Sequence, residues 1–148
     1  MNPEADKILS LSMQKLMSEI TPLLASGFAQ SQLGLLGFML TLAGNEYERG
    51  ADLRAKENAS IRQLLAASAP HVKDTDLQSR LVAAASARDD SLKISALNKA
   101  NWALRRALIE LHGHVEQLSG ENARAVERNI WVLLRLIAQE RMVKLGPS

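Results

Sequence analysis

The clearest pattern of apolar positions in this chain is a stripe in its C-terminal third. The spacing of the stripe alternates between four and three residues, and its members are Leu97, Asn101, Leu104, Leu108, Leu111, Val115 and Leu118. This spacing places all seven positions on one side of an α-helix. Other helices must cover such a stripe. We therefore predict an all-α protein, an up-down bundle of four to five helices.

The same region predicts a helical hairpin at the centre of the bundle. One helix is expected over about 92–118 and a second over about 122–144. Gly120 is expected to cap the end of the first helix, and Asn122 the start of the second. Because only a few residues connect them, the two helices should be antiparallel neighbours.

Capping residues mark the starts of two further helices. The first helix is expected to begin with Asn2 as its N-cap and Pro3 at its first position, and to end near Pro22. A short third helix is expected after Asp74 or Thr75, and its inner face comprises Leu77, Leu81 and Ala84.

The second helix, expected from near Ser31 to about Ala67, changes character along its length. Its first third is almost entirely apolar and carries a stripe of small residues, namely Gly34, Gly37, Thr41 and Gly44. Small residues let another helix approach closely, so packing is the favoured interpretation and a ligand groove the alternative. Residues 45–58 are mostly polar, which predicts exposure on most sides. The pattern leaves open whether the helix continues through Gly50.

Length and composition limit the function classes. With 148 residues the chain fits one domain, residues 1–148. The absence of cysteine excludes disulfides, thiolate metal sites and thiol nucleophiles. The acidic start of the chain is unlike a signal peptide, and no apolar run reaches the ~20 residues of a membrane span. We expect a cytoplasmic protein without a membrane span.

Apolar side chains away from the inward stripes of the last two helices predict a homodimer. Both tryptophans are among them, and tryptophan is enriched at interface centres. The alternative is a large core within one chain. The candidate interface residues are Trp102, Ile109, Trp131, Val132, Arg135 and Leu136.

Arg124, Arg128, Trp131 and Arg135 share one side of the last predicted helix. A basic stripe with an aromatic side chain is typical of nucleic-acid-binding surfaces. It is also typical of an exposed helix whose arginine stems cover an apolar ring. Since the net charge is only +2, nucleic-acid binding is not expected.

A polar flank beside the long stripe has two interpretations. Asn101 is the one amide within the stripe, and a buried amide commonly fixes helix register. Alternatively, the flank and the small residues of the second helix enclose a ligand. The candidate pocket residues are Gly37, Gly44, Asn98, Asn101, Arg105 and His112.

No catalytic residue, metal site or cofactor is predicted. A zinc-hydrolase motif needs two histidines four residues apart, whereas His112 and His114 are two apart and lie on different faces. We expect surface ion pairs between His112 and Glu116 and between Glu110 and His114. The first pair is the only plausible acid-base pair if the protein is an enzyme.

These patterns together favour a non-enzymatic bundle that dimerises and presents a helical surface to a protein partner, as an adaptor, chaperone or regulator. Partner contacts are expected at residues 45–58 and at the loop around His71. The alternative is a regulator that binds a small molecule between the second and fourth helices.

Overall fold

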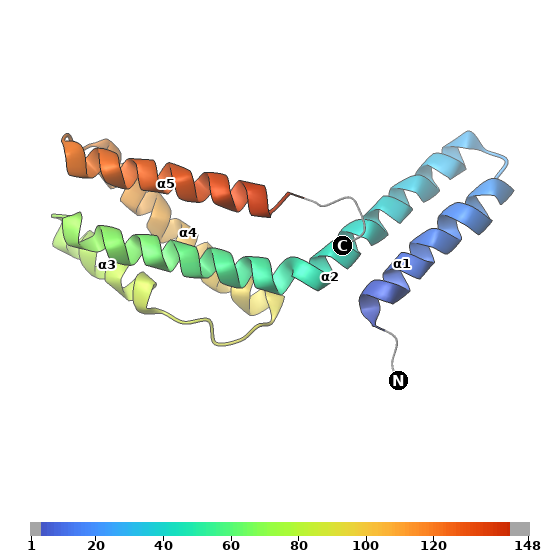
Figure 1. Ribbon diagram of the computed structural model, residues 1–148, viewed down its shortest axis with the longest axis horizontal. Helices are drawn as coiled ribbons and strands as arrows, with labels where there is room; N and C mark the ends of the chain where they lie inside the picture. Colours follow the sequence, from blue (N-terminus) through green and yellow to red (C-terminus); the bar gives the residue numbers. More distant parts are fainter. Residues whose placement is uncertain (1–3, 143–148) are drawn as a thin grey trace. The chain divides into compact units, whose positions relative to one another are not determined.

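The computed structural model describes residues 4–142, and all regular structure within this range is helical (Figure 1). The prediction of an all-α fold is confirmed. The α-helices are α1 (Ala5–Lys15), α2 (Gly27–Ser68), α3 (Thr75–Ser86), α4 (Ile94–Glu116) and α5 (Glu121–Glu140). A π-helical turn (Leu16–Ile20) and two 3-10 turns (Thr21–Leu23 and Ala69–His71) complete the described elements. Asn2, Pro3 and the predicted end of the last helix at 144 lie outside the described residues.

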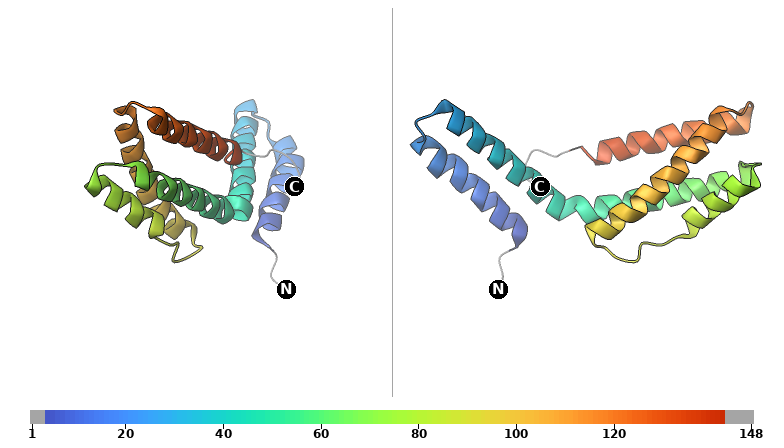
Figure 2. Two further views of the ribbon diagram at one scale, coloured as in Figure 1. Left: turned by 60° about the vertical axis from the view of Figure 1, so that its left-hand side comes forward. Right: turned by 180° about the vertical axis from the view of Figure 1, so that it is seen from behind.

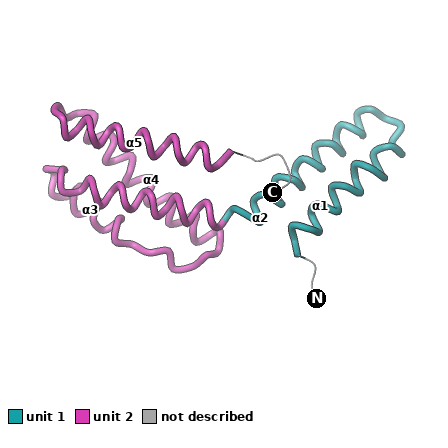
Figure 3. Tube along the Cα trace, viewed as in Figure 1, with its two compact units in different colours: residues 1–50, 143–148 teal, residues 51–142 magenta. Residues whose placement is uncertain are grey.

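The chain divides into two compact units (Figure 3). Within the described range, the first unit contains residues 4–50 and the second residues 51–142. The division falls inside α2, which is helical without interruption from Gly27 to Ser68 and therefore continues through Gly50. The expectation of one domain over residues 1–148 stays a prediction.

The first unit is a hairpin of α1 and the N-terminal part of α2 (Figure 2). Pro22 lies in the 3-10 turn that follows α1, where its ring prevents the helix from continuing. The small residues of α2 face α1: a Cβ atom on Gly37 would lie 3.2 Å from the Met17 sulfur, and one on Gly44 would lie 4.0 Å from the Leu9 Cβ. The packing interpretation therefore holds at Gly37 and Gly44, whereas a Cβ atom on Gly34 would meet nothing within 4 Å.

The second unit contains the C-terminal part of α2 together with α3, α4 and α5, which run alternately up and down (Figures 1 and 2). Helices α4 and α5 form the predicted antiparallel hairpin. The predicted stripe is buried from Leu97 to Val115, whereas Leu118 lies beyond the end of α4 and is exposed. The side chains without solvent exposure in the core of the unit are Ile61, Leu65, Leu81, Leu97, Leu111 and Ile130.

Two of the predicted caps have different outcomes. Asp74 caps α3 as predicted, since its side-chain oxygen accepts a hydrogen bond of 2.9 Å from the Leu77 amide. Gly120 does not cap α4, which ends at Glu116; it directly precedes α5, with a φ of 117° that disfavours other residues. The positive φ that favours glycine therefore belongs to the residue before α5, not to the end of α4.

The polar part of α2 is less exposed than predicted. Glu57 and Asn58 are both buried, and the side chain of Asn58 has no solvent exposure. The expectation that residues 45–58 are exposed on most sides is wrong at these two positions, because α4 covers them and supplies hydrogen-bond partners.

Candidate functional site

Glu57 is a buried carboxylate held by three side chains. Its Oε1 atom accepts hydrogen bonds of 2.8 Å from the Asn101 amide and from Arg105 Nε. Its Oε2 atom accepts one of 2.8 Å from Arg141 Nε. Both arginines also approach it through Nη2, forming ion pairs. One side chain of α2 is therefore bound to α4 and to the residue that follows α5.

The hydrogen bonds continue from Asn101 into the interior of the unit. The Asn101 amide also donates to Asn58 Oδ1, at 2.9 Å, and Asn58 donates to Asp89 Oδ1, at 3.1 Å. Asp89 lies in the connection before α4 and forms an ion pair with Arg62, with N–O distances of 2.6 and 3.0 Å. We call these residues the Glu57 network: Glu57, Asn58, Arg62, Asp89, Asn101, Arg105 and Arg141.

The sequence identified Asn101 and Arg105, but it missed their partner Glu57, although the spacing of polar residues on α2 gives a signal. Arg54 and Glu57 precede Ile61 and Leu65 at intervals of three and four residues, so they continue an apolar stripe as polar members. Polar side chains on such a stripe are buried with partners when the stripe faces other helices. The partner of Glu57 on α4 is 44 residues away in sequence.

The structure places the candidate pocket residues in both units. Gly37 and Gly44 lie in the first unit. In the second unit, Asn98 accepts a hydrogen bond from Arg54, while Asn101 and Arg105 belong to the Glu57 network. The polar flank of α4 is thus occupied by α2. A pocket that combines the two sets stays a prediction.

Electrostatics favour the charged forms of the two network carboxylates. Burial raises the pKa of Glu57, but hydrogen bonds from Asn101, Arg141 and Arg105 outweigh it, so that the pKa lies below the ordinary 4.5. For Asp89, the hydrogen bonds from Arg62 are the main cause of a pKa below the ordinary 3.8. Both groups therefore stabilise the fold while they are ionised.

We expect the free energy of unfolding to fall as the pH drops from 7 to 3. A carboxyl group whose pKa is lower in the folded than in the unfolded state contributes stability above its unfolded value, and this contribution is lost as the pH falls through the folded value. Urea unfolding measured at several pH values checks this. In Asp89→Asn the loss between pH 5 and 3 should be smaller than in the unmodified chain. An unfolding free energy that stays constant down to pH 3 would contradict the prediction.

The predicted acid-base residues do not assemble a catalytic group. His112 Nε2 lies 3.5 Å from Glu116 Oε1, but this buried nitrogen makes no hydrogen bond in the structure. The predicted pair of Glu110 with His114 is wrong, because Glu110 binds Arg80 on α3 at 3.0 Å. Within residues 4–142, no three His, Asp or Glu side chains are grouped so that they could hold a metal ion.

The candidate interface residues are all exposed. The exposed fractions of Trp102 and Ile109 are 76% and 72%, and those of Trp131, Val132 and Leu136 are each about half. Arg135 is exposed as well. The Trp131 ring meets the His112 ring edge-on, with centroids 5.6 Å apart. Because His112 and Ile109 are one turn apart on α4, Trp131 lies beside the side of α4 that carries Ile109 and Trp102. We call Trp102, Ile109 and Trp131 the tryptophan face.

Arginines accompany the tryptophan face. Arg128 pairs with Glu121 at 3.3 Å. By contrast, Arg106, Arg124 and Arg135 form no ion pair with any residue in the range 4–142. Glutamates also lie here: Glu116 is two turns after Ile109 on α4, and Glu127 is one turn before Trp131 on α5. This face is therefore apolar at its centre, with charges of both signs and an excess of arginine around it.

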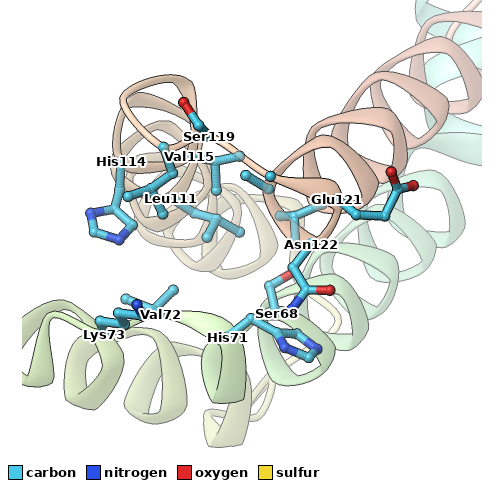
Figure 4. A pocket seen from close by; sticks show the side chains of 14 residues that line it. Ser68, His71, Val72, Lys73, Leu111, His114, Val115, Ser119, Glu121 and Asn122 are labelled. Atoms are coloured by element: carbon cyan, nitrogen blue, oxygen red, sulfur yellow. The ribbon is translucent and has the colours of Figure 1, made fainter.

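A cavity of about 340 Å³ lies at one end of the second unit (Figure 4). It is bounded by the segment between α2 and α3 and by the connection from α4 to α5. Polar groups and an apolar floor share its wall. The residues that line it include Ser68, His71, Val72, Lys73, Leu111, His114, Val115, Leu118, Asn122 and Val126.

The first unit exposes more apolar surface than the tryptophan face does. Among its described residues, eleven large apolar side chains are exposed: Ile8, Leu11, Met17, Ile20, Leu23, Phe28, Leu35, Leu36, Phe38, Met39 and Tyr47. No residue of α1 is buried. A two-helix hairpin with so little buried surface is not expected to be stable unless something covers it.

Comparison with known proteins gives no further assignment: no family model, curated protein or solved structure was found to match the chain. Helices long and apolar enough to span a bilayer are also absent from residues 4–142.

Proposed function

We propose that the protein is a non-enzymatic, dimeric helical scaffold. In this proposal the first unit joins two copies of the chain, and the second unit presents its tryptophan face to another protein. The observation that carries the proposal is the exposed apolar side of α2 in the first unit, opposite the side that packs on α1.

The exposed side of α2 is broad and continuous. Phe28, Leu35 and Met39 lie on the side of α2 opposite Gly37, with Leu36 and Phe38 on either flank. Phe28 is 75% exposed, and the other four are about half exposed. A helix that is apolar around its whole circumference is normally buried on all sides. Here α1 covers only one side.

A second copy is the occupant that fits this surface. No residue from Ile20 to Asn45 carries a charge, so a complementary surface must itself be apolar and uncharged. The same side of α2 in a second chain has this property. If each exposed side chain offers on the order of 100 Å², the five on this side supply roughly 500 Å² per partner. Neighbouring exposed apolar side chains of the hairpin then complete the roughly 800 Å² of a standard interface. Two hairpins together form four helices, with the closed two-fold symmetry common to homodimers.

The tryptophan face suits a different partner. Arg106, Arg124 and Arg135 have no ion-pair partner in the range 4–142, and a second copy would supply more arginine than glutamate opposite them, which disfavours docking. A protein that offers an apolar ridge with acidic residues beside it is complementary in both respects. This role corresponds to an adaptor or regulator.

Light scattering on the full chain tests which surface joins the copies. We expect a dimer for the unmodified protein and for Trp131→Glu, and a monomer for Leu35→Glu, because a buried carboxylate at the centre of an apolar interface is strongly unfavourable. Leu35 and Trp131 are both about half exposed, so neither change removes a core side chain.

Leu92→Glu serves as the matched control, since Leu92 is exposed in the connection between α3 and α4. It should remain dimeric, and circular dichroism should show that all variants stay helical. A monomeric unmodified chain would overturn the proposal. A dimer that dissociates only in Trp131→Glu would instead place the interface on the tryptophan face.

A further inference from the structure

We propose that the cavity at the end of the second unit binds a small carboxylate with a short apolar body. Its wall combines three basic side chains, His71, Lys73 and His114, with an apolar floor. This ligand site is separate from the self-association surface, because all the residues that line the cavity belong to residues 51–142.

The basic side chains come from two different segments. His71 and Lys73 lie between α2 and α3, whereas His114 projects from the last turn of α4. Figure 4 shows the His114 imidazole between α4 and the segment that carries Val72 and Lys73. The cavity wall therefore offers basic side chains from two segments. A carboxylate has two acceptor oxygens and can bind each segment with one of them.

His114 belongs to the cavity wall and has an unpartnered ring nitrogen. Its Nε2 atom is buried and makes no hydrogen bond within the protein. Buried polar atoms without a partner are rare, because each costs free energy relative to its hydrated state. Solvent does not reach Nε2 in this geometry, so a carboxylate in the cavity gives this nitrogen a partner only if the imidazole ring turns.

The start of α5 adds backbone donors at one end of the cavity. The first amides of a helix have no acceptor within the helix, and Gly120 has no side chain with which to cap them. The one acidic residue of the wall, Glu121, forms an ion pair with Arg128. Asp74, outside the wall, also interacts with His114, so the two carboxylates offset part of the positive charge of the three basic side chains.

The floor of the cavity selects for a ligand with an apolar part. Leu111, Val115 and Val126 are buried residues of the core that also line the cavity. An inorganic anion would leave this surface uncovered. A chain of several carbons would cover it while its carboxylate meets the basic side chains, and 340 Å³ accommodates such a molecule.

Binding of hexanoate to the full chain, measured by calorimetry and by NMR chemical-shift changes, tests the proposal. Hexanol is the neutral comparison, and inorganic phosphate the comparison without an apolar body. We expect hexanoate to bind at least about ten-fold more tightly than either, as the loss of one charge-assisted contact implies. Shifts should be centred on residues around His114 and Val126.

Variants assign the contacts. Lys73→Met and His114→Phe should each weaken hexanoate binding by about ten-fold. Lys99→Met, an exposed lysine of α4 outside the cavity wall, is the matched control and should bind as the unmodified chain does. Equal binding of hexanol, no saturable hexanoate binding, or equal weakening in Lys99→Met would each overturn the proposal. These readouts do not depend on whether the chain is a monomer or a dimer.

Discussion

Ile61→Ala is expected to lower the free energy of unfolding by about 2–5 kcal/mol, the range typical of large-to-small changes in a close-packed core. Ile61 has no solvent exposure and belongs to the core cluster of the second unit, which all four of its helices enter. Removal of three carbons loses apolar burial and leaves a cavity that the surrounding helices fill only partly. Urea unfolding followed by circular dichroism measures the loss.

Ile109→Ala is the matched control for this prediction, because the same atoms are removed from a side chain that is 72% exposed. Its effect should remain within about 0.5 kcal/mol, since surface changes away from special features are nearly neutral. Equal losses in the two variants would mean that Ile61 does not lie in a packed core.

Glu57→Gln should cost about 1.5–3 kcal/mol, the scale of a lost charge-assisted hydrogen bond. The amide keeps the shape of the side chain, but it no longer attracts Arg105 and Arg141. The new side-chain amide also places its two N–H donors beside guanidinium groups, which contain no acceptor atom. The two guanidinium groups are about half exposed and can regain water, which limits the loss. The measurement is again urea unfolding, here at pH 7.

Glu48→Gln is the control for the Glu57 change, because Glu48 is an exposed glutamate of the same helix. It should be nearly neutral. A double-mutant cycle with Arg141→Gln separates the pair from its surroundings: the combined variant should lose less than the sum of the single losses. Strict additivity would contradict a direct interaction between Glu57 and Arg141.

Features with a local cause were predictable from the sequence. The stripe of α4 identifies its buried side because helical periodicity alone decides it, and Asp74 caps α3 because a carboxylate at that position accepts a backbone amide. Gly120 was recognised as a boundary residue but assigned to the wrong helix. A glycine with positive φ can follow the end of one helix or precede the start of the next. The sequence alone therefore does not show which of the two helices Gly120 borders.

Features with distant causes were not predictable. Glu57 is polar, and its burial depends on Asn101 and Arg141, which the sequence places far away. Likewise, the apolar first third of α2 was recognised, but not how little of it α1 covers. Coverage depends on which helices meet in space, whereas the helical pattern specifies only which side chains require it.

The position of the two tryptophans allows fluorescence to report on one unit alone. Trp102 and Trp131 both lie in the second unit, and residues 1–50 contain no tryptophan. Fluorescence excited at the red edge of the absorption band therefore follows the second unit alone, while helical circular dichroism follows both. Melting curves that coincide by the two methods would show one cooperative transition. Curves that separate would show that the two ends of α2 lose their helical structure in different steps.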